Sequence, residues 1–150
     1  LLEKQNGSWG LKDQDIIDNF KSNPDNSCLV SFRRTGSHWL RMLMELYFER
    51  PSLVRIFYYP ESDNYLTLHT HDLDLDFKCS RMIYLYRDPV KTIYSQLKYH
   101  KENQNDEDRI RYWSEIYSNH LGKWLVKEDF TNKKTIVRYE SLAIILGMNL

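Results

Sequence analysis

A short, wholly apolar run at residues 82–86 (Met-Ile-Tyr-Leu-Tyr) ends at Arg87-Asp88-Pro89, and Ser95 follows eight residues after the arginine. A continuous apolar run of this length predicts a buried, parallel β-strand. Asp88 then suits the N-cap of a helix, and Pro89 suits its first position, where no backbone N–H is needed. Arg87 and Ser95 should therefore meet at the carboxyl edge of a sheet, where open α/β folds bind anionic ligands. An arginine fork and a hydroxyl suit one phosphate group.

The same pattern occurs earlier, where the apolar run at residues 28–32 leads into Arg33-Arg34-Thr35-Gly36-Ser37-His38-Trp39-Leu40. The backbone N–H groups from Thr35 to His38 should line a concavity at a helix N-terminus, and Arg34 adds a charge-assisted contact. The segment is not a Walker A loop, because no Gly-Lys-Ser/Thr follows at the required spacing. Gly36 is its only glycine, which excludes the Rossmann fingerprint. Two such corners on one sheet predict a ligand with two separated anionic groups.

These motifs resemble those of the sulfotransferases that use 3′-phosphoadenosine 5′-phosphosulfate (PAPS). The family's first motif reads approximately Pro-Lys-Ser-Gly-Thr-Thr-Trp-Leu, and its second reads Arg-Asp-Pro-Arg-Asp with a serine eight residues after the first arginine. Many members carry Lys-Thr-His between the two and a strand ending in Tyr-Glu-Asp-Leu late in the chain. The matching segments here are residues 33–40, 87–91 with Ser95, His69-Thr70-His71, and Val137-Arg138-Tyr139-Glu140-Ser141-Leu142.

The resemblance implies sulfuryl transfer from PAPS to a hydroxyl or amine of a small-molecule or carbohydrate acceptor, with no metal. His71 would act as the general base, and Arg34 would stabilise charge on the departing 5′-phosphate. Arg87 and Ser95 would hold the 3′-phosphate, and Trp39 and Tyr139 would contact adenine. The expected catalytic residues are His71 and Arg34; those expected to bind the donor are Arg34, Thr35, Gly36, Ser37, His38, Trp39, Arg87, Ser95 and Tyr139.

The chain also departs from the family pattern. Arg33 and Arg34 stand where the family has proline and lysine, and His69 stands where it has lysine before Thr-His. Arginine for lysine keeps the charge but changes the geometry of phosphate contacts. The Gly-rich basic segment that closes over the nucleotide has no counterpart before Leu150. We therefore expect residues 1–150 to form a single sulfotransferase-like domain that is incomplete at its C-terminus.

Alternating strand and helix patterns predict an α/β fold with a central, mostly parallel sheet flanked by helices, and the resemblance adds a three-layer, P-loop-like arrangement. We expect strands at residues 28–32, 82–86 and 134–138. Residues 51–78 should be irregular, with aromatic side chains at 57–65 as a candidate acceptor wall. The expected helices cover residues 13–20, from about 39 to 48, from 89 to about 100, 107–126, and the apolar C-terminal end.

Composition narrows the class of protein. The chain has 21 basic and 21 acidic residues, so no overall field attracts nucleic acid or a membrane surface. No apolar run approaches the ~20 residues that span a bilayer. We expect a soluble, cytoplasmic domain in which Cys28 and Cys79 stay reduced.

The polar residues also allow two other interpretations. His69 and His71, with Asp72, Asp74 and Asp76, offer enough ligands for a metal ion. Their alternation with apolar residues instead favours a half-buried strand or an extended loop that shows its acids to water, so we expect no metal. Arg33 and Arg34 are also compatible with solvated surface charges.

Two functional alternatives also stay open. One is a P-loop-like small-molecule kinase, which needs Mg²⁺ and a carboxylate to hold it. The other is a non-catalytic nucleotide-binding remnant of the sulfotransferase fold.

Overall fold

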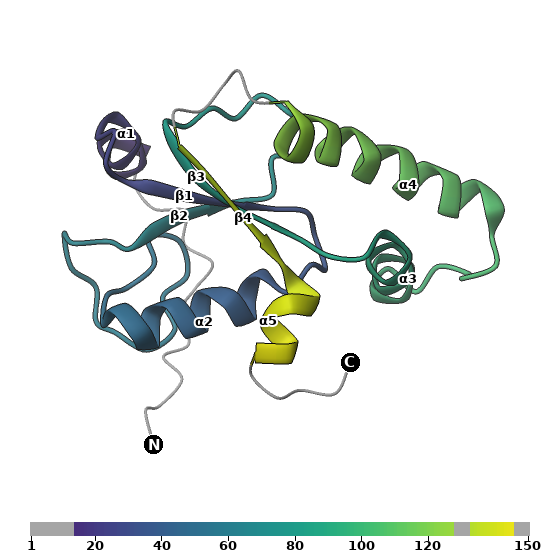
Figure 1. Ribbon diagram of the computed structural model, residues 1–150, viewed down its shortest axis with the longest axis horizontal. Coiled ribbons are helices and arrows are strands. Elements are labelled where there is room, and N and C mark those ends of the chain that lie inside the picture. Colours follow the sequence, from purple (N-terminus) through teal and green to yellow (C-terminus); the bar gives the residue numbers. More distant parts are fainter. Residues whose placement is uncertain (1–13, 128–132, 146–150) are drawn as a thin grey trace.

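The computed structural model describes residues 14–127 and 133–145, arranged around one β-sheet (Figure 1). In chain order, its elements are α1 (Gln14–Ser22), β1 (Ser27–Ser31), α2 (Ser37–Phe48), β2 (Thr67–Thr70), β3 (Arg81–Tyr86), α3 (Pro89–Tyr99), α4 (Glu107–Leu121), the π-helical turn η1 (Gly122–Val126), β4 (Lys133–Arg138) and α5 (Tyr139–Ile145). The predicted first helix corresponds to α1, except that Asp13 lies outside the described residues.

The sheet has four strands in the order β2-β1-β3-β4, and every neighbouring pair is parallel. The apolar strands β1 and β3 occupy the centre, where Leu29 of β1 pairs with His69 on one side and Ile83 on the other. The predicted α/β fold with a mostly parallel sheet is therefore confirmed. Since parallel strands end at the same edge, the segments that follow all four strands emerge at one carboxyl edge.

Helices cover both faces of the sheet, with α2 and α5 on one side and α3 and α4 on the other (Figure 1). Apolar side chains of β1 and β3 alternate between these two layers, as the two-residue period of a strand requires. Three buried clusters fill these layers. On the α2 side it is Leu29, Leu40 and Leu85, and on the other side it is Val30, Met82, Tyr84 and Trp124. The third joins Phe32 to residues of α3 and α4, namely Ile93, Leu97, Trp113 and Tyr117. Within residues 14–127 and 133–145, none of the helices combines the length and the apolar character needed to span a bilayer.

Three local expectations need correction. Residues 51–78 are not irregular throughout, because β2 lies within them and pairs with β1. Its four residues, Thr-Leu-His-Thr, form no apolar run, and pairing with a central strand overrides that weak local signal. The predicted long helix is α-helical only to Leu121 and continues as the π turn η1. Asp72 does not face water but is buried at 7% exposure.

Candidate functional site

The carboxyl edge of the sheet brings together residues from four separate parts of the chain. Arg34 follows β1, His71 follows β2, Arg87 follows β3 and Tyr139 follows β4. In parallel α/β sheets, the loops at this edge form the usual ligand site. The residues predicted from the first and second motifs therefore emerge at the edge where a ligand is expected.

The loop between β1 and α2 has a backbone suited to binding an anion. Gly36 is the N-cap of α2 and has a left-handed conformation, with φ of 92°, and no side chain of the described residues caps this helix end. The first N–H groups of a helix have no acceptor within the helix, so they are available to an anionic ligand. Thr35 is buried and its hydroxyl donates to the carbonyl of Phe32 at 2.7 Å, which fixes the turn.

Gly36 is also required by a close approach to Tyr139. A Cβ at this position would lie 2.5 Å from two ring carbons of Tyr139, well inside van der Waals contact. The ring of Trp39 meets the same tyrosine edge-on, with centroids 5.7 Å apart, and the guanidinium carbon of Arg87 lies 4.6 Å from the tyrosine centroid. Tyr139 therefore packs the first loop against the ends of β3 and β4.

Arg34, Arg87 and Ser95, which we call the arginine cluster, converge beside this loop. Nε–H of Arg34 donates to Oγ of Ser95 at 3.3 Å, and Nη1 of Arg87 donates to the carbonyl of Arg34 at 3.3 Å. Nε of Arg87 is buried without an acceptor among the described residues. None of the ion pairs in the described part of the chain includes either arginine. The cluster thus holds two positive charges together, and neither pairs with a carboxylate of residues 14–127 or 133–145.

The helix α3 begins as the sequence predicts and fixes Arg87 in place. The carboxylate of Asp88 accepts from the N–H of Lys91 at 2.9 Å, and Pro89 occupies the first turn, which confirms the predicted cap. The hydroxyl of Tyr117 accepts from the N–H of Arg87 at 3.2 Å and donates to its carbonyl at 2.8 Å. Burial raises the pKa of Tyr117, so this hydroxyl keeps its proton.

Of the aromatic residues that contact the cluster, Tyr139 was expected from the sequence, whereas Tyr117 and Tyr99 were not. Tyr117 occupies a position that an amphipathic helix usually turns toward the core. Nothing in the helical spacing of apolar residues indicates that its hydroxyl binds the main chain of Arg87. Tyr99 also contacts the cluster, with its ring centroid 4.8 Å from the guanidinium carbon of Arg34. It occurs one helical turn after Ser95, the spacing at which two side chains share a helix face, so periodicity could have found it.

The second group of site residues is formed by His69 and His71 at the end of β2. Nδ1 of His71 lies 2.8 Å from the carbonyl oxygen of Ser31. A carbonyl only accepts, so Nδ1 carries the proton and Nε2 carries the lone pair. Burial lowers the pKa of His71, which favours the neutral ring at neutral pH, although the bond to Ser31 opposes this shift.

His69 is held by two other side chains. Its Nε2 lies 3.0 Å from the hydroxyl of Ser31, and its Nδ1 lies 3.5 Å from Nη1 of Arg41. Burial holds the pKa of His69 well below its usual range, and the charge of Arg41 adds to the shift. Both ring nitrogens of His69 are thus engaged, whereas His71 keeps Nε2 for another partner.

His38 lies on the exposed side of this group, in contact with the guanidinium of Arg55. Burial and then the charge of Arg55 lower the pKa of His38 to about 4. Its ring meets Phe57 edge-on, with centroids 5.9 Å apart. Of the predicted acceptor wall, Phe57 therefore borders the histidines, whereas Tyr65 packs into the core beside Phe20.

The segment that carries Arg55 and Phe57 is fixed to α2 by two buried residues that sequence analysis missed. The carboxylate of Glu45 accepts from the N–H groups of Ser52, Phe57 and Tyr58 at 2.9–3.0 Å. Arg41 donates to the carbonyls of Val54 and Arg55. These charged side chains hold the backbone of this segment beside the histidines.

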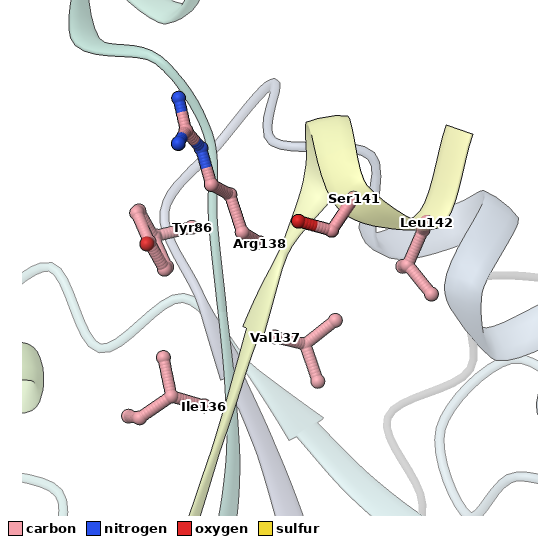
Figure 2. A pocket seen from close by; sticks show the side chains of 6 residues that line it. All are labelled: Tyr86, Ile136, Val137, Arg138, Ser141 and Leu142. Carbon is pink, nitrogen blue, oxygen red and sulfur yellow. The ribbon is translucent and has the colours of Figure 1, made fainter. Parts of the chain in front are cut away.

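A separate hollow of about 280 Å³ borders the edge strand β4, and no residue of the arginine cluster lines it. Figure 2 shows Tyr86, Ile136 and Arg138 on one face of β4 and Val137 and Leu142 on the other. The hollow thus follows the outer strand of the four-stranded sheet and does not overlap the candidate site.

Asp72 does not join the histidines as a metal ligand, because its carboxylate turns into the core toward Lys123 and Trp124. Among the described residues, no three His, Cys, Asp or Glu side chains gather closely enough to hold a metal ion.

No family model and no curated protein sequence matches this chain. Its function is therefore inferred from the geometry of the carboxyl edge and from the short motifs. The contact between Arg34 and Ser95 joins the first motif to the second, and the contact between Gly36 and Tyr139 joins the first to the last. Residues far apart in sequence thus meet around one loop.

Proposed function

We propose that this chain binds PAPS at the carboxyl edge of its sheet and transfers the sulfuryl group to the hydroxyl or amine of an acceptor. The arginine cluster carries this proposal. It gathers two guanidinium groups and a hydroxyl beside an uncapped helix N-terminus, and none of the ion pairs in the described residues includes these arginines. Such an arrangement suits a ligand with phosphate groups.

The hydrogen-bond donors at this edge suit the 3′-phosphate and the 5′-phosphate of the nucleotide. Arg87, whose buried Nε has no acceptor among the described residues, would bind the 3′-phosphate together with Ser95. Arg34 touches Ser95 and also belongs to the first loop, so it can bridge the 3′-phosphate corner and the loop. The N–H groups after Gly36 would bind the 5′-phosphate. When bound, PAPS supplies the sulfuryl group and a stable leaving group.

His71 would serve as the general base. Its Nε2 carries the lone pair because Nδ1–H donates to Ser31, and its lowered pKa keeps it neutral. As the acceptor oxygen bonds to sulfur, its proton passes to Nε2. The bond between sulfur and the bridging oxygen breaks, and adenosine 3′,5′-bisphosphate leaves with the electron pair. Arg34 and the loop N–H groups would stabilise the charge on the departing phosphate.

Calorimetric titration of the wild-type chain with adenosine 3′,5′-bisphosphate, AMP and ATP–Mg²⁺ tests the proposal. We expect the bisphosphate to bind about 10-fold or more tightly than AMP, because a charge-assisted contact to a second phosphate contributes about 1.5–3 kcal/mol. Preference for ATP–Mg²⁺ would favour the small-molecule kinase. Tight binding of the bisphosphate without turnover on any acceptor would identify the non-catalytic remnant, and no binding of any nucleotide would reject the site.

A further inference from the structure

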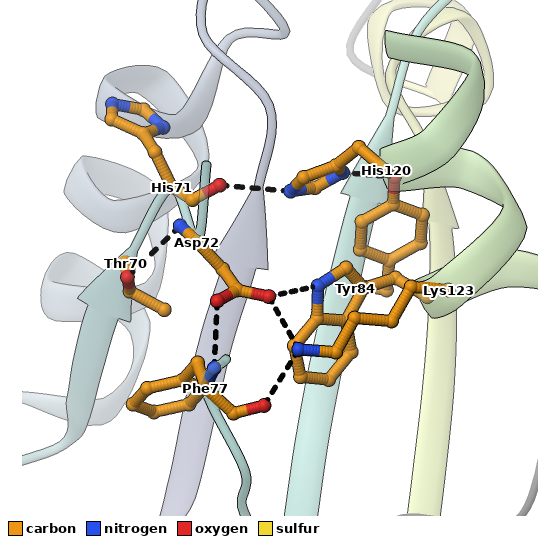
Figure 3. Close-up of polar contacts among 8 residues, drawn as sticks. Thr70, His71, Asp72, Phe77, Tyr84, His120 and Lys123 are labelled. Atoms are coloured by element: carbon orange, nitrogen blue, oxygen red, sulfur yellow. Dashed lines mark hydrogen bonds and ion pairs between the residues drawn. The ribbon is translucent and has the colours of Figure 1, made fainter. Parts of the chain in front are cut away.

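The segment that follows β2 is attached to the core by a buried polar network of Asp72, Tyr84, His120, Lys123 and Trp124. Figure 3 shows His120 of α4 beside the main-chain carbonyl of His71, and Lys123 of η1 beside the carboxylate of Asp72. Trp124 of η1 donates to the same carboxylate, and Tyr84 of β3 contacts His120. The side chain of Asp72 is fully buried and that of Lys123 is 14% exposed. A buried ion pair adds little net stability, so its presence calls for another explanation.

The carboxylate of Asp72 is satisfied on both oxygens. Oδ2 accepts from Nζ of Lys123 and from Nε1 of Trp124, each at 2.7 Å, and Oδ1 accepts from the N–H of Phe77 at 2.8 Å. The backbone of Asp72 has φ of 42°, a conformation that L-residues rarely adopt. Its own N–H donates to the hydroxyl of Thr70 at 3.1 Å. These bonds hold the chain in a sharp, unusual turn directly after His71.

The π turn η1 explains how two consecutive residues can reach the same oxygen. Lys123 and Trp124 both belong to η1, whose extra residue per turn changes the directions of side chains relative to an α-helix. Isolated π turns occur often at functional sites. Gly122, the first residue of η1, has room for a Cβ, so the turn does not arise from crowding at this glycine.

His120 binds the same segment one residue earlier. Its Nδ1 lies 2.8 Å from the hydroxyl of Tyr84, and its Nε2 lies 2.8 Å from the carbonyl oxygen of His71. Because that carbonyl only accepts, Nε2 of His120 carries the proton and Nδ1 accepts from Tyr84. Both His120 and Tyr84 are buried, at 1% and 0% exposure. The donor and the acceptor in both hydrogen bonds of His120 are therefore fixed.

We propose that Asp72 and His120 are positioning residues that orient His71 for proton transfer. His120 holds the main-chain carbonyl of His71, Asp72 holds the turn after it, and Ser31 holds its Nδ1–H. With backbone and ring both fixed, Nε2 of His71 keeps one direction and one tautomer. This inference rests on the proposed role of His71 in sulfuryl transfer, but the tautomer of its ring can be measured without turnover.

The test compares variants that remove the bond from His120 to the His71 carbonyl with variants that keep a donor to it. In His120→Phe/Tyr84→Phe, the bond to the His71 carbonyl is lost together with the tyrosine hydroxyl. In His120→Gln, a side-chain amide N–H can still donate to that carbonyl. Phe20→Ala removes core packing beneath α1 and serves as the control for lost stability alone. Each variant is studied below its own unfolding temperature.

Three measurements are made on each variant: turnover, affinity for adenosine 3′,5′-bisphosphate, and the tautomer of His71 from side-chain ¹⁵N NMR. In the double variant we expect kcat to fall by about 10²-fold, as small misplacements of a catalytic group do, with the bisphosphate Kd nearly unchanged. The ¹⁵N NMR signature of the His71 tautomer that is protonated at Nδ1 should weaken. His120→Gln should recover most of the rate and the signature, and Phe20→Ala should keep both.

Unchanged kcat and an unchanged His71 tautomer in the folded double variant would overturn the inference. If that variant does not fold, Asp72→Asn/Lys123→Met removes both buried charges together and is judged by the same measurements. If the wild type transfers no sulfuryl group, the proposed function fails, and the NMR signature alone decides the inference. A loss of the Nδ1–H signature relative to Phe20→Ala supports the positioning role, and its persistence rejects it.

Discussion

At the carboxyl edge of the sheet, the side chain of Arg87 contacts the Arg34 carbonyl and the Tyr139 ring, and one of its buried donors has no acceptor in the described part of the chain. Nη1 donates to the Arg34 carbonyl, and the guanidinium lies over Tyr139, while Nε has no acceptor among the described residues. Leaving a buried donor unpaired costs about 1–3 kcal/mol. A bound phosphate would remove that cost, so Arg87 is the residue at which ligand binding should be most sensitive.

Replacing Arg87 with alanine should therefore separate two nucleotides. We expect Arg87→Ala to weaken binding of adenosine 3′,5′-bisphosphate about 10- to 100-fold, the effect of one charge-assisted contact, and to change AMP binding little. Calorimetric titration measures both ligands. Arg81→Ala, at the other end of the same strand, is the matched control because that arginine pairs with Asp25. Equal losses for the two ligands would remove Arg87 from the 3′-phosphate site.

Arg33 and Arg34 are adjacent, but only Arg34 makes contact with Ser95 and Tyr99. We expect Arg34→Ala to abolish detectable transfer, with the fold unchanged by circular dichroism, and Arg33→Ala to have a milder effect. Each variant serves as the charge control for the other. A larger loss in Arg33→Ala, with both chains equally folded, would place the first motif out of register by one residue.

His71 should set the acid limb of the pH–rate profile. Burial is the largest influence on its pKa and lowers it, the bond to Ser31 opposes this, and Arg33 and Arg41 lower it further. A base must be unprotonated, so turnover should rise with pH through an apparent pKa below 6.5 and be complete at neutral pH. His71→Ala should lose about 10²–10⁴-fold in kcat with donor affinity retained. Full activity in this variant, with any acceptor, would exclude His71 as the base.

At the scale of elements, the β1–α2 connection depends on one glycine. Gly36→Ala should lower the free energy of unfolding by about 1–3 kcal/mol, because alanine is strained at positive φ and its Cβ would meet the Tyr139 ring. Gly122→Ala is the matched control, since Gly122 is helical and nothing lies within 4 Å of its added Cβ. Chemical denaturation measures both. A smaller loss in Gly36→Ala than in Gly122→Ala would show that the loop adapts to a side chain.

The elements that the sequence predicts well are those with strong local signals. The apolar runs of β1 and β3 are both central strands, and Asp88 caps α3 as its position before Pro89 indicates. β2 was missed because only Thr67 and Leu68 among its residues are buried, which gives neither an apolar run nor an alternation. Its strand conformation depends on pairing with β1, a contact that no local pattern reveals.

At the scale of the whole molecule, the candidate site depends on contacts between distant parts of the chain. The motif spacing predicts that Arg34, Arg87 and Ser95 lie at one edge, and the structure brings them into contact. The buried position of Asp72 could not be predicted, because its partner Lys123 lies 51 residues later. Whether these residues bind PAPS stays a prediction.

The buried histidines should make the stability of the whole domain depend on pH. Burial lowers the pKa of His120 to about 4 and also lowers those of His69 and His71. Between a folded-state pKa near 4 and an unfolded value near 6.5, the unfolded chain binds more protons, so stability rises with pH. The stabilisation is therefore complete above about pH 6.5 and is lost as the pH falls toward 4. For His120 alone, a shift of this size corresponds to about 3 kcal/mol.

Urea unfolding at a series of pH values between about 4 and 7 measures this dependence, and the His120→Phe/Tyr84→Phe variant isolates one contribution. We expect the wild-type free energy of unfolding to fall steeply through this range. The variant should show a shallower slope, because one buried histidine no longer gains a proton on unfolding, whereas His69 and His71 still do. Parallel slopes for the two proteins would mean that His120 binds its proton equally well in the folded and unfolded chains, contrary to its burial between Tyr84 and the His71 carbonyl.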